Sequence, residues 1–399
     1  MRTLSVLRKL IVKAVPIHAI RLNALMAAVQ ALTLGAQARV TSLGRHVIGT
    51  AFEKHKIKRM DRLLSNPHLY QECSSIYTAL TRRLVKGLAE PIILIDWSPL
   101  CADQSWQLLR AALPVGGRTI TLYEEVHPQS KLGNRKVQHQ FLSKMATMIP
   151  VTCHPIIVAD SGFKTPFFRY IENTLGWHWV GRIRGRDFIY GYNEIDQWIS
   201  SKSLHQLATK IAKYLGQIQW TKSNPLAAFV VLIRGSKKRR TALTYTGKKR
   251  QSKKNKTYAK RQKEPWLLVV SLSLHGRTPE QIVKIYRTRM QIEEGFRDCK
   301  AVHYGLNLSQ KKNMRMERRS ILCLLATLAN FILWCIGIAG KHMPIAKQVR
   351  VNSSSKREPY SAIFLGHLLM AQKKFRISAK AILSSLRVIK PYMESVLSG

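Results

Sequence analysis

The stretch that decides the fold is "YRTRMQIEEGFRDCK", residues 286–300, where two adjacent glutamates stand in a strongly basic segment. The whole chain has only 21 acidic residues against 66 lysines and arginines. At about 100° per residue, a helix gathers four of these side chains on one stripe about 60° wide: Tyr286, Arg289, Glu293 and Lys300. Glu294 lies well off that stripe. The two glutamates are therefore expected to have different roles.

An apolar seam beside this stripe predicts how the helix packs. Ile285, Ile292 and Phe296 fall within about 40° of one another on the same helical wheel. The segment Thr278-Pro279-Glu280 predicts the start of the helix, with Thr278 as N-cap and proline at the first helical position. Packing through the seam would direct the stripe along the edge of a sheet, with Glu294 facing solvent or a neighbouring basic residue.

Two apolar strands are predicted to supply that edge. "PIILIDWS" (91–98) and "PIIVAD" (155–160) each run into an aspartate, Asp96 and Asp160. Ligands of open α/β sheets collect at the carboxyl ends of strands, so both are candidate site residues together with Glu293. The alternative is that each aspartate only serves a turn.

Three carboxylates that converge in a positive field need cations between them, because their pKa values would otherwise rise. Two Mg²⁺ ions would satisfy them, and such a pair suits phosphodiester chemistry. Arg289 would then hold phosphate through its fork and Lys300 as a point charge, while Tyr286 would bond a phosphate or pack a sugar. The alternative is that Arg289 and Glu293 form only an i,i+4 ion pair.

The order of predicted elements indicates an α/β core, β-β-β-α-β-α-β. A hairpin is expected around Gly116-Gly117, a helix at 134–148, a helix near 166–175 and the strand "WHWVGRIRG" after it. Residues 187 to about 263 break this rhythm with short strands and a basic run from Arg234 to Lys263, which we expect to be solvated or ordered on DNA. The strand at 265–273 resumes the core.

Residues 1 to about 85 are predicted to be helical. Within them, "TSLGRHVIG" (41–49) and "KHKIKRMDRLLSN" (54–66) have the pattern of a helix-turn-helix. The second helix carries five basic residues suited to DNA: Lys54, Lys56, Lys58, Arg59 and Arg62. The alternative is a solvated basic face.

The charge of the chain points to a polyanionic partner. A formal net charge of +45 and a pI near 10.6 oppose compaction, and nucleic acid is the first candidate, with an anionic membrane second. The six cysteines form no C-x-x-C pair and no tight cluster, which argues against a zinc ribbon and a disulfide scaffold and fits a reducing cytosol. No P-loop, H-E-x-x-H, G-x-S-x-G or dinucleotide-binding loop occurs.

An uncharged segment, residues 320–340, is long enough to span a bilayer. We favour a helix buried in a helical core, because a single span after a basic α/β chain would be unusual.

The spacing Tyr286-x₂-Arg289-x₃-Glu293-x₆-Lys300 matches the Y-R-E-K signature of bacterial insertion-sequence transposases of the IS-four family. "VADSGF" around Asp160 and "LIDWS" around Asp96 resemble the two aspartate motifs of that family. The chain is most similar to its Tn-ten branch, from "IKRMDRLLSN" to beyond Lys300.

The resemblance implies an RNase H-like catalytic core with a β-rich insertion, flanked by helical regions. Asp96, Asp160 and Glu293 would be the catalytic metal ligands, and Mn²⁺ would substitute for Mg²⁺. Trp266 is the candidate to stack on a flipped base, although tryptophan beside proline is also common in cores. The implied segments are a DNA-binding domain (1–85), the core (86–186 and 264–302), the insertion (187–263) and a C-terminal helical region (303–399).

The same resemblance implies cut-and-paste transposition through a DNA hairpin. The partners would be double-stranded DNA, as terminal inverted repeats and target, and a second copy in a synaptic homodimer. The expected location is the bacterial cytoplasm, near the nucleoid and without a membrane. Three alternatives stay open: an RNase H-like nuclease without strand transfer, a catalytically silent DNA-binding relic, and a membrane-attached basic protein.

Overall fold

The computed structural model describes the chain over most of its length, in two compact units. One unit comprises Met1–His154 with Thr288–Ser395, and the other comprises Pro155–Arg287 with Val396–Gly399. The predicted basic run falls, from residue 236 onward, outside the described residues. These are 2–184, 187–194, 196–235, 264–301, 305–308, 313–349, 359–372 and 375–398.

The first unit begins with five helices, which confirms the prediction for residues 1–85. Asn66 starts the last of them, because its side chain accepts a hydrogen bond from the Leu69 amide at 2.9 Å and Pro67 follows it. The helices are α1 (Arg2–Ala14), α2 (Ala19–Thr33), α3 (Val40–His46), α4 (Glu53–Leu64) and α5 (Pro67–Leu84).

The short helices α3 and α4 pack against each other, as the helix-turn-helix pattern predicts. Their backbones approach most closely at Gly44, where an added Cβ would lie 2.5 Å from the Cα of Ile57. The absence of a side chain at Gly44 therefore permits the close contact.

Three antiparallel strands follow in the spatial order β3-β2-β1. They are β1 (Ile92–Pro99), β2 (Trp106–Pro114) and β3 (Thr119–Pro128), and α6 (Arg135–Met148) comes after them. Gly116 and Gly117, both with φ near +85°, make the predicted hairpin turn between β2 and β3. The strand register places Arg110 on β2 opposite Asp96 on β1 and opposite Glu124 on β3.

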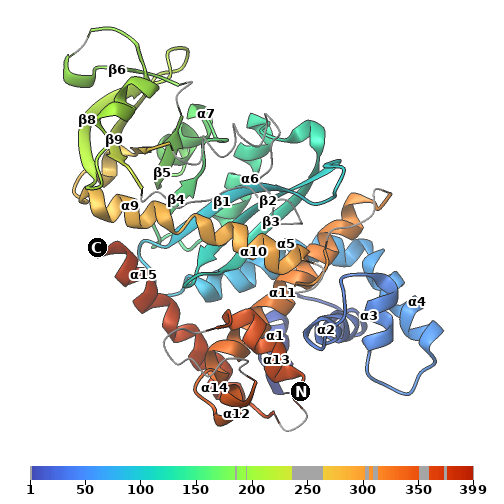
Figure 1. Ribbon diagram of the computed structural model, residues 1–399. Helices are drawn as coiled ribbons and strands as arrows, with labels where there is room; N and C mark the ends of the chain where they lie inside the picture. Colours follow the sequence, from blue (N-terminus) through green and yellow to red (C-terminus); the bar gives the residue numbers. More distant parts are fainter. Residues whose placement is uncertain are drawn as a thin grey trace, which may run out of the picture. The chain divides into compact units, whose positions relative to one another are not determined.

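The helices of the C-terminal part complete this unit. Figure 1 shows α10 (Met290–Lys300) lying over β1–β3, which it contacts. The long helix α11 (Met316–Gly340) follows, and 89% of its most apolar window is buried, so the predicted buried helix is confirmed. By length and composition alone α11 passes as a membrane span. The remaining helices are α12 (Pro344–Gln348), α13 (Ala362–Met370), α14 (Ala379–Ser385) and α15 (Ile389–Leu397).

The second unit orders its strands β4-β5-β10-β9-β8-β6-β7. Only the β4–β5 pair is parallel among the pairings described for this unit. Its elements are β4 (Ile156–Ala159), α7 (Thr165–Arg169), η2 (Tyr170–Thr174), β5 (His178–Ile183), β6 (Phe188–Tyr190), β7 (Ile199–Ser200), β8 (Lys213–Trp220), β9 (Leu226–Ile233), β10 (Trp266–Val270) and α9 (Pro279–Arg287).

The expected continuous helix through residues 286–300 is wrong. Helix α9 ends at Arg287, Thr288 and Arg289 form a turn, and α10 begins at Met290. The two helices pack on different strands, since α9 contacts β5 and β9 whereas α10 contacts β1–β3. The helical start at Thr278 is confirmed, because Thr278 and Gln281 exchange side-chain-to-backbone hydrogen bonds of 2.9 and 3.3 Å.

Candidate active site

The first carboxylate of the site lies where β1 leaves the buried core. Residues Ile92 to Ile95 are fully buried, and the Asp96 side chain after them is 16% exposed. Its Oδ1 accepts a hydrogen bond from the Trp97 amide at 2.8 Å. The other oxygen, Oδ2, lies 3.6 Å from Nη1 of Arg289.

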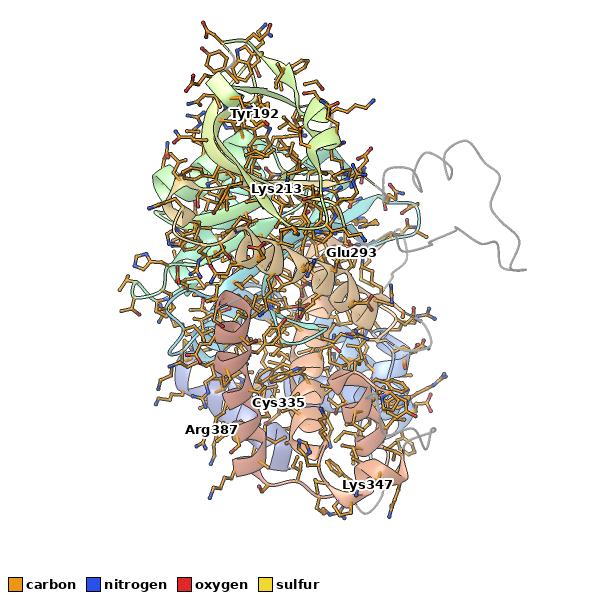
Figure 2. The ribbon with its side chains drawn as sticks, turned by 60° about the vertical axis from the view of Figure 1, so that its left-hand side comes forward. Tyr192, Lys213, Glu293, Cys335, Lys347 and Arg387 are labelled. Carbon is orange, nitrogen blue, oxygen red and sulfur yellow. The ribbon has the colours of Figure 1, made fainter. Side chains whose placement is uncertain are left out.

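Arg289 links this aspartate to the first glutamate of α10. Its Nη2 donates to Oε1 of Glu293 at 2.8 Å, one helical turn away. Figure 2 labels Glu293 on α10, where its side chain is 47% exposed. One guanidinium, itself only 13% exposed, thus holds both Asp96 and Glu293. The i,i+4 pair is therefore part of a larger contact that reaches β1.

Lys300 occupies the same face at the other end of α10. Its Nζ donates to the carbonyl of Pro99 at 2.8 Å and to the hydroxyl of Ser98, both on β1. The ammonium also lies 4.8 Å from the ring centre of Phe296. Burial, with a smaller effect of the nearby Arg110 charge, lowers the pKa of Lys300 to about 8.

Glu294 has a separate set of partners. Its Oε2 accepts from Nη1 of Arg297 at 2.9 Å and lies 3.6 Å from Nη1 of Arg118. The two glutamates have different partners, as the helical wheel predicts: Glu293 shares Arg289 with Asp96, and Glu294 pairs with basic neighbours.

Asp160 belongs to the second unit, directly after β4. Its Oδ1 accepts from the Gly162 amide at 2.7 Å, which closes a tight turn. A Cβ on Gly162 would lie 2.9 Å from that same oxygen. The structure therefore gives Asp160 the local turn role that its sequence position allowed, with its side chain partly exposed.

Tyr286 and Trp266 contact each other, also in the second unit. Their rings meet edge to face with centres 5.2 Å apart. Tyr286 is 3% exposed, and Trp266 opens β10 with intermediate burial. Because of the helix break, Tyr286 does not share a helix with Arg289, Glu293 and Lys300.

The family is decided by the match of residues 88–329 to the sequence model of the transposase DDE domain. That segment covers well over half of the 399 residues and contains every carboxylate described above. The chain belongs to the DDE transposase family. No curated protein matches it significantly. The protein is thus a transposase, and DNA is its partner in transposition and recombination.

The oxygen donors of the transposase fit the divalent ions that this family generally uses. Asp96 and Glu293 present hard carboxylate oxygens to one cationic group, and carboxylates are preferred ligands of Mg²⁺ and Mn²⁺. Within the described ranges, no group of three or more His, Cys, Asp or Glu side chains is close enough to hold a metal. Two of the three expected carboxylates, Asp96 and Glu293, instead share Arg289 as their partner.

The transposase exposes a basic face on α4. Lys58 and Arg59 are exposed, as is Arg62 one turn later. Asp61 on this helix is held by Arg318 at 2.9 Å, a hydrogen bond that lowers the pKa of the aspartate. The acidic residue is thus neutralised from α11, and the face keeps its positive character.

Sequence reasoning missed two residues of the site. Ser98 binds Lys300, and its place two residues after Asp96 puts both on one face of β1, a signal that strand alternation offers. Arg110, in the middle of the apolar strand β2, donates hydrogen bonds to Gly295 and Cys299 of α10. A lone arginine in such a strand was the available signal, but only tertiary contacts reveal its partner.

Proposed function

We propose that this transposase catalyses cut-and-paste transposition of an insertion sequence of the IS-four type, with Asp96, Asp160 and Glu293 as its catalytic carboxylates. The observation that carries the proposal is the joint contact of Asp96, Arg289 and Glu293 inside the family's matched segment. The Y-R-E-K spacing supports the IS-four family, and the likeness from "IKRMDRLLSN" to beyond Lys300 supports its Tn-ten branch. The antiparallel β1–β3 and parallel β4–β5 pairings are compatible with an RNase H-like core.

In this proposal Asp96, Asp160 and Glu293 would hold two Mg²⁺ ions, for which Mn²⁺ would substitute. Such ions activate an attacking oxygen and stabilise a leaving one. Arg289 and Lys300 supply positive charge for the scissile phosphate, the first as a planar fork and the second as a point charge. Tyr286, whose ring contacts Trp266, bonds a phosphate or packs against a sugar of the DNA. Trp266 stacks on a base that is flipped out of the DNA duplex at the hairpin step.

The proposed reaction has four phosphodiester steps. Water cleaves one strand at the element end and leaves a 3′-hydroxyl, which attacks the opposite strand and closes a hairpin as the flanking DNA departs. A second water opens the hairpin. The 3′-hydroxyl then attacks a target phosphodiester and displaces its 3′-oxygen.

The α3–α4 pair, with Lys58, Arg59 and Arg62, binds the terminal inverted repeat, and two copies pair two ends in a homodimer. In this proposal the chain is divided into a DNA-binding domain (1–85), the catalytic core (86–186 and 264–302), the insertion (187–263) and a C-terminal helical region (303–399). The protein acts in the bacterial cytoplasm, near the nucleoid. The exposed basic face of α4 suits duplex DNA, because such a helix can lie in a groove while its basic side chains contact phosphates.

The test is excision of a short insert, flanked by the element's own ends, from a plasmid. Wild type, Glu293→Gln and the matched neighbour Glu294→Gln are compared with Mg²⁺ and with EDTA. We expect excision and hairpin ends from wild type and Glu294→Gln, and neither from Glu293→Gln or in EDTA. Excision by Glu293→Gln contradicts the proposal. Nicked ends without joined products indicate a nuclease, and end binding without any cut indicates a silent relic.

A further inference from the structure

A buried ion pair lies in the core of the first unit, beneath α10. The side chains of Arg110 on β2 and Glu124 on β3 are 1% and 0% exposed. Nε of Arg110 donates to Oε2 of Glu124 at 2.7 Å. A buried pair is weak evidence for stability by itself, because desolvation offsets much of the attraction. Its role therefore depends on what else the two side chains hold.

Arg110 directs the rest of its guanidinium at α10. Nη1 donates to the carbonyl of Gly295 at 3.4 Å, and Nη2 donates to Sγ of Cys299 at 3.4 Å. The guanidinium carbon lies 4.8 Å from the ring centre of Phe296. All three contacts fall on the segment between Glu293 and Lys300, so Arg110 holds the part of the helix that carries both.

Glu124 is fixed from two other helices. The hydroxyl of Tyr77 on α5 donates to its Oε1 at 3.0 Å, and Oγ1 of Thr327 on α11 donates to the same oxygen at 2.8 Å. Asn330, also on α11, donates to Sγ of Cys299 at 3.2 Å. The pair therefore connects α5, β2, β3 and α11 to one short stretch of α10.

The fit of α10 on the sheet leaves little freedom at this point. Gly295 lies so close to β3 that an added Cβ would collide with Oγ1 of Thr119. The close contact at Gly295 fixes the distance of α10 from the sheet, and the hydrogen bonds from Arg110 fix its rotation about its own axis.

We propose that Arg110 is a positioning residue of the transposase, which sets Glu293 and Lys300 for the reaction through its contacts with α10. The inference rests on the proposed function, since it assigns work to Glu293 and Lys300. Arg110 acts through the helix and touches no reacting group. A displacement of about 1 Å in catalytic groups costs about a hundredfold in rate, which gives the contact functional weight.

The test uses the double variant Arg110→Met/Glu124→Gln, which leaves no unpaired buried charge. The matched control is Arg319→Met. Arg319 is also 1% exposed in the same unit, but it donates to the carbonyl of Met314 at 2.9 Å and to Sγ of Cys101 at 3.2 Å. Three quantities are measured in each protein: amide hydrogen exchange of residues 290–300, affinity for an element end, and the single-turnover cleavage rate.

We expect exchange in residues 290–300 to rise about tenfold in the double variant alone. Its cleavage rate should fall about thirtyfold or more, with end affinity within about twofold of wild type. Arg319→Met should lower the melting temperature and keep the cleavage rate per folded molecule. Unchanged exchange, or faster exchange with wild-type cleavage, overturns the proposal, as does an equal effect in Arg319→Met.

Two further experiments cover a double variant that does not fold and a failure of the proposed function itself. If the double variant does not fold, Arg110→Lys keeps the charge beside Glu124 but loses the fork, and the same local exchange and rate loss are expected. If exchange rises as expected but wild type never cuts DNA, the positioning of α10 stands and the proposed function fails.

Discussion

At the residue scale, Arg289 neutralises two carboxylates with its two terminal nitrogens. Nη1 faces Asp96 and Nη2 faces Glu293. In the proposed function, an ion bound by both carboxylates would take over this counter-charge and would leave the guanidinium available for phosphate. The helical period predicts the Arg289–Glu293 contact from the sequence. The reach of Arg289 to Asp96 was expected only as a shared sheet edge, because it depends on where α10 packs.

Lys300 should make cleavage sensitive to alkaline pH. Its pKa of about 8, lowered mainly by burial, means that the protonated fraction falls to about one tenth by pH 9. The positive charge of Lys300, which the proposed function assigns to phosphate, is thus present below pH 8 and lost above it. We expect the cleavage rate of wild type, divided by that of Lys300→Arg, to fall about fivefold or more between pH 7 and 9. A pH-independent ratio contradicts this role.

Gly162 should be needed to orient Asp160. A methyl group there would press on Oδ1 of Asp160 at 2.9 Å and rotate the carboxylate. Gly162→Ala is expected to reduce cleavage about tenfold to a hundredfold with unchanged end binding. Gly276→Ala is the control in the same unit, since its added Cβ meets no atom within 4 Å. Equal cleavage rates in Gly162→Ala and Gly276→Ala would contradict a role of Asp160 in cleavage.

At the element scale, most helices and strands of the described chain follow from local patterns. The apolar runs of β1 and β4 and the N-cap Thr278 are recognisable in the sequence and are found in the structure. The turn at Thr288 and Arg289 could not be predicted, because no proline or glycine marks it. It exists because α9 and α10 pack on different strands, which is tertiary information.

The crossing of α11 and α13 depends on Gly337. An added Cβ there would collide with the carbonyl of Ala362, which is backbone and cannot move aside. At Gly340 it would instead meet the flexible side chain of Leu369. Gly337→Ala is expected to lower the free energy of unfolding by about 3 kcal/mol, and Gly340→Ala by about 1 kcal/mol. Denaturant titration checks this, and equal losses would contradict the crossing.

At the scale of the whole molecule, the net charge of +45 sets how the transposase meets DNA. Phosphate contacts release counterions, so the logarithm of the association constant should fall steeply with the logarithm of salt concentration. Lys58→Ala should reduce that slope by about one unit. Lys390→Ala, an exposed lysine on α15, should leave the slope unchanged. Equal slopes for wild type and Lys58→Ala would exclude α4 from the DNA interface.

The most direct test of the central claim is a count of Mn²⁺ bound to the complex of transposase and element end, by electron paramagnetic resonance. Wild type is compared with Asp96→Asn, Asp160→Asn, Glu293→Gln and the control Glu294→Gln. We expect Mn²⁺ binding in wild type and Glu294→Gln, with affinity at least about tenfold weaker in each of the other three. Full Mn²⁺ binding by Asp96→Asn, Asp160→Asn or Glu293→Gln would contradict the three-carboxylate site.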